Sequence, residues 1–207
     1  MSLDLTHLAA IAAALGWASG LRLYAVVFLT GAAGHLGWVP LPAGLQLLQH
    51  PLVLGASFLM FVMEFVVDKV PGVDTLWDSL HTLIRIPAGA ALAAAVFSGT
   101  VDAGEIGSAW ALVAALAGGT LAATSHAAKA TTRAAANTSP EPFSNIGLSL
   151  LGDAAVPAML WLAWEHPLWF FPALALAVLL ALLLIVVFFK FLRSLVRRFF
   201  PAAQTVA

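Results

Sequence analysis

The sequence predicts an all-α membrane protein, a polytopic transmembrane helical bundle of about six spans. Of its 207 residues, 62% are hydrophobic and only 9% are charged, whereas soluble domains carry about 25% charged residues. Apolar segments recur at roughly the 20-residue length that crosses a bilayer. The chain has no cysteine, which excludes disulfides, thiolate metal sites and cysteine nucleophiles. We therefore expect a single transmembrane domain, residues 1–207, with no separate soluble domain.

The first apolar segment, residues 5–36, is too long for one span perpendicular to the membrane. Gly16, Ser19 and Gly20 interrupt it, and Arg22 follows two residues later. Glycine and serine leave backbone free to line a polar cavity inside a membrane protein. We predict an interruption near Gly20 that separates a half-helix from a second helix, with one long tilted helix as the alternative.

The second span, 51–67, follows a Pro- and Gly-rich loop at 37–50 and ends at an Asp-Lys pair. After a Pro-Gly turn, Asp74 has the position expected of an N-cap for the next helix. Proline inside a helix removes a hydrogen bond and crowds the preceding turn. We therefore predict that Pro87 kinks or breaks the helix and so interrupts it, after which residues 88–97 complete the crossing.

Three more apolar segments follow, at 109–128, 146–164 and 168–189. The first is rich in alanine and glycine, which lets neighbouring helix backbones pack closely in a membrane. The last contains no charged residue. Residues 190–207 form a basic amphipathic tail, which we expect to extend the last helix along an anionic membrane surface.

The lysines and arginines of the tail predict the orientation of the chain. Cytoplasmic segments next to spans carry an excess of these residues, so we expect a cytoplasmic C-terminus in a bacterial cytoplasmic (inner) membrane. Counting spans back from this end places the charged segments 69–85 and 129–133 on the same side. The loops 37–50, 98–108 and 165–167 then lie outside, and none contains Lys or Arg.

Ionisable residues are unusually dense beside these spans, although charges in a membrane are costly. Asp74, Asp78, His81 and Arg85 lie at offsets 0, 4, 7 and 11, which is one face of a helix. A second cluster, residues 125–133, repeats part of this spacing, because His126, Lys129 and Arg133 lie at offsets 0, 3 and 7. We predict substrate-binding roles for Arg22, Lys69, Asp78, His81, Arg85, His126, Lys129 and Arg133, and gating or coupling roles for Glu64, Asp68, Asp74 and Asp153.

These charges also have a structural explanation, which the sequence leaves open. The first cluster resembles an internal network that locks helices together, and the second a cationic helix end favoured by the helix dipole. The five cations and five anions that we predict in the core of the bundle carry equal and opposite total charge. Such a set neutralises itself and still exchanges partners when a solute enters. Histidine changes charge near neutral pH, so His81 and His126 suit proton coupling.

The two halves of the chain share a pattern of charged motifs. A cationic motif, G-L-R or S-H-A-A-K, is followed in each half by a span with acids, E-F-V-V-D or L-L-G-D. Transporters built from inverted repeats have broken helices at corresponding positions. We therefore predict an inverted repeat.

Five strings resemble a bacterial membrane family, the domain of unknown function 4126. They are G-L-R-L-Y (20–24), E-F-V-V-D-K-V-P-G-V-D-T-L-W-D (64–78), R-I-P-A-G-A (85–90), S-H-A-A-K-A (125–130) and S-L-L-G-D (149–153). The resemblance covers about residues 8–163. Gly152 stands where an acidic residue is common in that family, and Ile86 separates an arginine and a proline that are usually adjacent. The resemblance implies a fold and singles out positions without implying an activity.

The hypothesis we favour is a transporter or channel-like permease. It moves a small phosphate- or carboxylate-bearing anion through a charged intramembrane cavity, with proton coupling, and it needs no catalytic residue and no cofactor. The expected partners are the lipid bilayer, the small anionic solute and a second copy of the chain, with no nucleic acid. One alternative is an intramembrane enzyme acting on a lipid or polyprenyl phosphate, with Mg²⁺ held by Asp68, Asp74 and Asp78. Another is a structural or assembly subunit.

Overall fold

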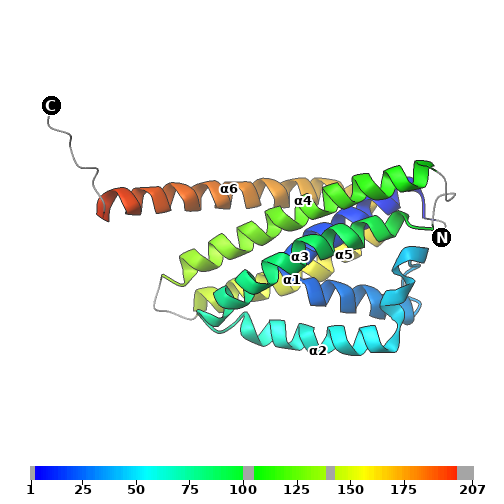
Figure 1. The fold of residues 1–207 in the computed structure, drawn as a ribbon, viewed down its shortest axis with the longest axis horizontal. Helices are drawn as coiled ribbons and strands as arrows, with labels where there is room; N and C mark the ends of the chain where they lie inside the picture. Colours follow the sequence, from blue (N-terminus) through cyan, green and yellow to red (C-terminus); the bar gives the residue numbers. More distant parts are fainter. Residues whose placement is uncertain (1–2, 100–104, 139–142, 200–207) are drawn as a thin grey trace.

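The computed structural model describes residues 3–99, 105–138 and 143–199. These residues form helices and no strand, and the helices lie along one another in an elongated bundle (Figure 1). In chain order they are α1 (Leu5–His35), the 3-10 helix η1 (Ala43–Gln49), α2 (Pro51–Val67), α3 (Val73–Phe97), α4 (Glu105–Ala136), α5 (Phe143–Glu165) and α6 (Pro167–Phe199).

Length and composition identify candidate membrane-spanning segments. Within the described residues, α1, α3, α4, α5 and α6 are each long and apolar enough to cross a membrane. The pair of η1 and α2, bent by 70°, passes the same test when it is taken together and makes a sixth candidate. The prediction of an all-α, multi-pass helical bundle is therefore confirmed.

Helix α1 breaks at Arg22, whose φ of −147° and ψ of 75° are not helical. The break divides α1 into a first arm, residues 5–21, and a second arm, residues 23–35. The predicted interruption near Gly20 is therefore confirmed.

The two arms of α1 run in opposite directions. Along the first arm, Gly16 lies beside Gly118 and Gly20 beside Ala122 of α4, so this arm is parallel to α4. On the second arm, Phe28 packs against Phe58 of α2 with ring centroids 5.1 Å apart, and Gly31 further along lies against Leu48 and Leu54. This arm is therefore antiparallel to α2.

Because its arms run in opposite directions, α1 folds back on itself, and both of its ends lie at the end of the bundle that carries η1. Figure 1 shows the N-terminus there and the C-terminal end of α6 at the opposite end. The bundle thus consists of five helices that each run between its ends, α2 to α6, and a folded-back α1.

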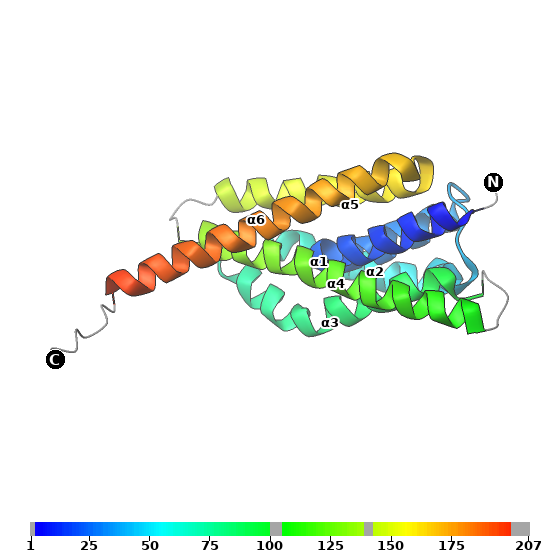
Figure 2. The same ribbon diagram turned by 90° about the horizontal axis from the view of Figure 1, so that it is seen from above.

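The first arm of α1 lies at the centre of the bundle, between the pair α3 and α4 and the pair α5 and α6 (Figure 2). Most of its residues are buried. Close packing depends on glycine, since a Cβ added to Gly16 would lie 2.5 Å from the Cα of Gly118. The small residues predicted to allow close approach along 109–128 do so here.

Helix α3 shows the kink and not the break of the two outcomes predicted at Pro87, because it runs continuously from Val73 to Phe97 with this proline inside it. Figure 2 shows a bend in α3 and no separation into two helices. A proline costs one backbone hydrogen bond, which a bend accommodates. Packing on α4 on both sides of the proline holds α3 helical, with Thr82 against His126 before it and Gly89 against Ala122 after it.

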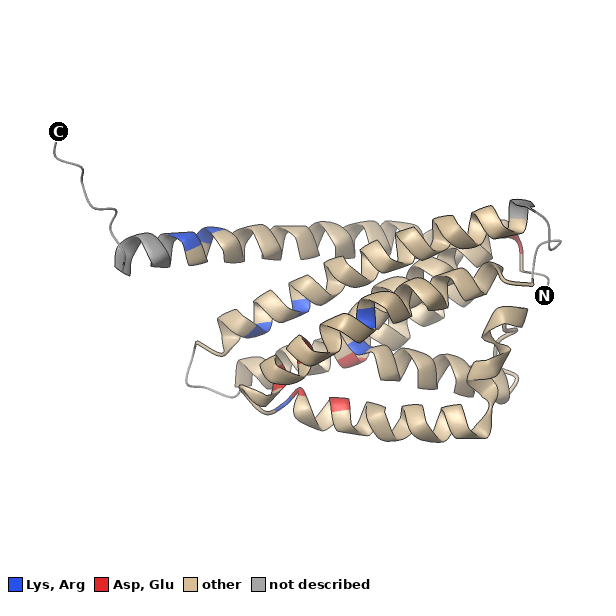
Figure 3. Cartoon of the chain, in the orientation of Figure 1, with Lys and Arg blue, Asp and Glu red and all other residues tan. Residues whose placement is uncertain are grey.

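Helix α6 continues as a single helix to Phe199 and projects past the other helices (Figure 1). The part of the basic tail up to this residue is therefore a helix extension, as predicted. Residues 200–207 of the predicted tail lie outside the described residues. The described charges gather mainly in the half of the bundle nearer the C-terminal end of α6 (Figure 3).

Candidate functional site

One continuous network of ion pairs joins residues from five helices and the turn between α2 and α3. The sequence places these residues in two separate clusters and two isolated positions, and the fold brings them together. The cations are Arg22, Lys69, Arg85, Lys129 and Arg133, and the anions are Glu64, Asp68, Asp74, Asp78 and Asp153.

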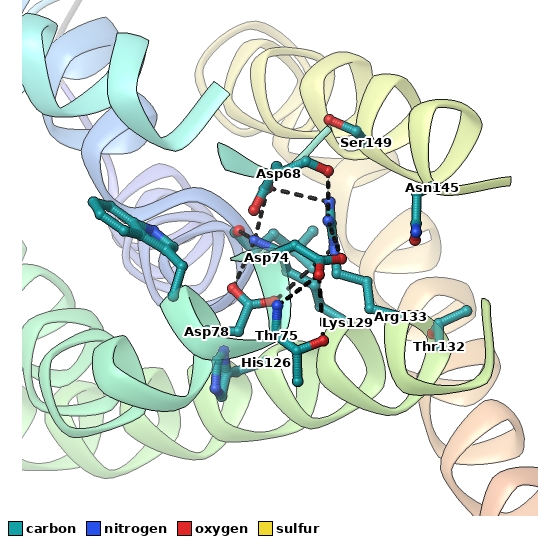
Figure 4. A network of polar contacts seen from close by, with 12 residues as sticks. Asp68, Asp74, Thr75, Asp78, His126, Lys129, Thr132, Arg133, Asn145 and Ser149 are labelled. Carbon is teal, nitrogen blue, oxygen red and sulfur yellow. Dashed lines mark hydrogen bonds and ion pairs between the residues drawn. The ribbon is translucent and has the colours of Figure 1, made fainter. Parts of the chain in front are cut away.

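Asp68 is the centre of the network (Figure 4). It is the C-cap residue of α2 and is fully buried. Its Oδ2 lies 2.6 Å from Arg22 Nη1, 2.9 Å from Lys129 Nζ and 3.2 Å from Arg133 Nη2. Arg133 also donates a hydrogen bond of 2.6 Å to the Asp68 carbonyl oxygen. Three cations from α1 and α4 therefore converge on one carboxylate oxygen.

A second branch of the network runs along α3. The Oδ1 of Asp78 lies 2.6 Å from Arg85 Nη1 and 3.1 Å from Lys129 Nζ. Arg85 Nη2 lies 2.5 Å from Oε1 of the fully buried Glu64 on α2. The stripe of charges predicted on this helix is thus present, and it faces the bundle interior.

Asp74 has a different role from the predicted N-cap. The N-cap position of α3 is Gly72, with a φ of 83°, and Asp74 lies in the first helical turn. Its carboxylate accepts hydrogen bonds of 3.0 Å from Arg133 and 3.1 Å from Asn137. The left-handed conformation of Gly72 starts the helix two residues early and turns Asp74 toward α4.

The third branch leads to α5 through Arg22. Asp153 Oδ1 lies 2.8 Å from Arg22 Nη2, and its Oδ2 lies 3.4 Å from Lys69 Nζ. Ser149 accepts hydrogen bonds from both cations, at 2.9 Å and 3.2 Å. Lys69 lies in the turn after α2, where partial burial lowers the pKa of its amine even though the Asp153 carboxylate opposes the shift.

The two predicted histidines are placed differently. His126 Nε2 lies 2.7 Å from Thr82 Oγ1, and its Nδ1 lies 3.3 Å from Arg85 Nη1, so His126 borders the network. His81 stacks on Trp77 with ring centroids 4.0 Å apart and meets Tyr24 edge-on. No ion pair or hydrogen bond links His81 to the network within the described part of the chain.

A cavity of about 440 Å³ lies beside the network, between the first arm of α1 and helices α4, α5 and α6. Four of the predicted residues line it: Arg22, Asp68, Lys129 and Arg133. A smaller cavity of about 70 Å³ lies between α3 and α4, and Asp78, His126 and Arg133 line it. Arg133 belongs to both walls. The other predicted residues, apart from His81, pair with or border the network away from the larger cavity.

Ser149 and Thr132 also line the larger cavity, and the sequence prediction omitted both. Ser149 precedes Asp153 by four residues, so the two share a helix face, and this spacing is a signal that could have identified it. Thr132 has no comparable signal. Ser125 lines this cavity too, and it donates a hydrogen bond of 2.7 Å to the Trp17 carbonyl oxygen and so joins α4 to α1.

The proposed magnesium ligands do not form a metal site in this arrangement. Among the described residues, no group of three or more His, Asp or Glu side chains is placed to hold a metal ion. Asp68, Asp74 and Asp78 each face Arg133, at 3.2, 3.0 and 4.0 Å. A cation therefore occupies the space between these carboxylates.

The family model described as domain of unknown function 4126 matches residues 9–188. The chain belongs to this family. The match includes every member of the ionic network, and it extends beyond the predicted 8–163 to most of α6. No curated protein and no solved structure matches the chain. The family description names no activity, so the chemistry of the site is the ground for a functional proposal.

Proposed function

We propose that this protein is a membrane permease for an anionic solute that carries a phosphate or carboxylate group. The supporting observation is the convergence of Arg22, Lys129 and Arg133 on one oxygen of Asp68, at the wall of a 440 Å³ cavity. Three cations around one carboxylate form a site for negative charge, and in the unliganded protein the chain supplies that charge itself.

Asp68 makes exchange with a solute energetically feasible. Unpaired charges in a low-dielectric interior are strongly destabilising, so cations there require a partner at every stage. An entering anion takes over contacts from the Asp68 carboxylate one at a time, and no cation is left unpaired. The guanidinium groups of Arg22 and Arg133 suit a phosphate or carboxylate because both offer fork-shaped sets of donors.

Arg133 lies between the two cavities, and we propose that the solute's route across the network passes it. It forms part of the wall of both, and Asp78 and His126 line the smaller one. An anion that leaves Asp68 with Arg133 as its partner also keeps Lys129 within reach, because Lys129 contacts both Asp68 and Asp78. Because histidine changes charge near neutral pH, His126 is the residue we propose for proton coupling.

The side of the membrane that the cavity faces follows from the orientation predicted from the sequence. With the C-terminus in the cytoplasm of a bacterial cell, the charged half of the bundle lies toward the cytoplasmic face of the inner membrane. We propose that the cavity first accepts its solute from that half.

A structural role is the competing proposal, and a specific observation favours it. Every cation of the network already has at least one carboxylate within 4.0 Å, so the network would also hold the helices together without any solute. The two proposals differ in what they predict for added anions.

The Asp68→Asn variant distinguishes the transport proposal from the structural one, because asparagine keeps the shape of the side chain and removes its charge. We expect the variant to unfold at lower temperature, since removing one partner of a buried pair costs on the order of 3 kcal/mol. Phosphate or acetate should stabilise it more than wild type, because the cations are then without their carboxylate. A ligand at 100 times its Kd adds about 2.7 kcal/mol.

Asp74→Asn is the matched control, because Asp74 contacts Arg133 but does not line the larger cavity. It should be destabilised without gaining sensitivity to anions. Flux of phosphate or acetate into proteoliposomes completes the test. Transport is refuted if anions stabilise neither wild type nor Asp68→Asn and the wild type gives no flux.

A further inference from the structure

We propose that the solute is amphiphilic, with a phosphate or carboxylate head and an apolar chain, and that it enters sideways from the bilayer between α5 and α6. This inference rests on the proposed function and specifies its substrate class. It starts from the part of the larger cavity that the ionic network does not occupy.

The charged and polar groups lie on one side of this cavity. The side formed by α6 is made of Ala177, Leu180, Ala181 and Leu184, and none of these residues carries a polar side chain. On α5, Leu148, Leu151, Ala155 and Met159 continue the apolar wall. The cavity therefore has one cationic end and a long apolar remainder.

A small hydrophilic anion fits this shape poorly. Binding sites of 300 to about 1,000 Å³ enclose whole organic molecules, and phosphate alone would occupy only the cationic end of 440 Å³. Water enters a cavity only where the wall offers it several polar partners, and the apolar remainder offers none. With phosphate alone bound, this part of the cavity would therefore gain no favourable contact. An attached hydrocarbon chain fills this remainder and gains about 0.8 kcal/mol for each buried CH₂ group.

The opening of the cavity lies on the outer surface of the spans. Leu151 of α5 and Leu180 and Leu184 of α6 line the cavity, yet they are 67%, 50% and 44% exposed on the outside of the bundle. Side chains that belong to both surfaces mark a gap between the two helices. In a membrane the medium at that gap is lipid, so the cavity opens to the bilayer.

The direction of the cavity matches that of a lipid molecule. Leu148 and Ser149 lie near the start of α5, at the level of the network, and Met159 lies further along the same helix. The chains of membrane lipids extend from the interface toward the bilayer centre. A head at Arg22, Lys129 and Arg133 would therefore place its chain along α5 and α6, parallel to its neighbours in the membrane.

Three probes test this on the full-length protein in nanodiscs of neutral lipid: dodecyl phosphate, dodecanol and inorganic phosphate. The readout is the shift of the thermal unfolding midpoint with probe concentration. We expect dodecyl phosphate to bind the wild type at least 10-fold more tightly than inorganic phosphate, and dodecanol to cause a smaller shift than dodecyl phosphate.

Ala155→Phe places a ring in the apolar part of the cavity. It should weaken the binding of dodecyl phosphate at least 10-fold and leave that of inorganic phosphate unchanged. Ala154→Phe is the matched control, because Ala154 is exposed and does not line the cavity. Ala158→Phe, at an exposed position that does line it, repeats the test if Ala155→Phe does not fold.

The outcomes separate this inference from the proposed function. Equal affinity for dodecyl phosphate and inorganic phosphate overturns the amphiphile and leaves an anion permease standing. Dodecanol binding as tightly as dodecyl phosphate also overturns it, because the cationic end would then contribute nothing. Failure of all three probes to bind the wild type overturns both proposals.

Discussion

At the scale of single residues, Asp68 differs from the other acids because one of its oxygens lies within 3.2 Å of three cations. Such an arrangement concentrates positive charge where a solute can reach it, since Asp68 also lines the larger cavity. The other acids hold the cations in place from the far side. Glu64 and Asp78 do this for Arg85.

The ten charged members of the network could be predicted because each is anomalous in its own segment. A charge in an apolar run is costly unless it is paired, so the sequence alone identifies Arg22 and Asp153 as residues in need of partners. The pairings themselves depend on how the helices pack. The sequence placed His81 on the same helix face as Asp78 and Arg85, whereas its ring stacks on Trp77 of the preceding turn.

Lys69 gives a prediction about pH. Its folded-state pKa is lowered from the ordinary 10.5, mainly by burial, so the unfolded chain binds more protons than the folded one in the range just below that value. The free energy of unfolding should therefore rise as the pH increases toward 10.5. Thermal unfolding across the alkaline range measures this slope.

Lys69→Met should remove the contribution of Lys69 to that slope. Lys190→Met is its control, because Lys190 is an exposed lysine on α6 and its replacement should leave the slope in place. An unchanged slope in Lys69→Met would mean that other groups cause the dependence.

At the scale of elements, the packing of α1 against α4 depends on glycines that meet face to face. A methyl group at Gly16 would lie 2.5 Å from the Cα and 2.8 Å from the carbonyl oxygen of Gly118. Because both atoms belong to the backbone, the helices themselves would have to separate. We expect Gly16→Ala to lower the free energy of unfolding by about 1–3 kcal/mol or more.

Gly55→Ala is the matched substitution on α2, where a Cβ would have no neighbour within 4 Å. Alanine is the better helix former by roughly 0.5–1 kcal/mol, so this variant should be unchanged or slightly stabilised. Denaturant titration of both variants in the same detergent provides the comparison. A Gly16→Ala protein as stable as Gly55→Ala would contradict the close approach of α1 and α4.

The sequence predicted the break in α1 but not the reversal of chain direction that follows it. Glycine and serine before Arg22 indicate where a helix can stop, and they carry no information on the direction that follows. The direction depends on Arg22, whose side chain reaches Asp68 after α2 and Asp153 on α5. The sequence likewise left open whether Pro87 kinks or breaks α3, and packing on α4 outweighs the local cost of the proline and leaves only the kink.

At the scale of the whole molecule, the folded-back α1 changes the topology. A straight α1 would bring the two termini to the same face of the membrane, whereas the observed bundle has them at opposite ends (Figure 1). The distribution of charge agrees with this. Residues 1–21 contain no Lys or Arg, as expected of a segment outside the cytoplasm. The inverted repeat predicted from the two halves stays a prediction.

The absence of cysteine from the chain makes the topology directly measurable. Asp4→Cys introduces a thiol at an exposed position at the N-terminal end, and Arg193→Cys does so near the C-terminal end. With a cytoplasmic C-terminus, a membrane-impermeant maleimide added to intact spheroplasts should label Asp4→Cys at once. It should label Arg193→Cys only after lysis. Labelling of both thiols from the same side would contradict the reversal at Arg22. Labelling of Arg193→Cys alone in intact spheroplasts would keep the reversal and invert the proposed orientation, and the charged half of the bundle would then face the cell exterior.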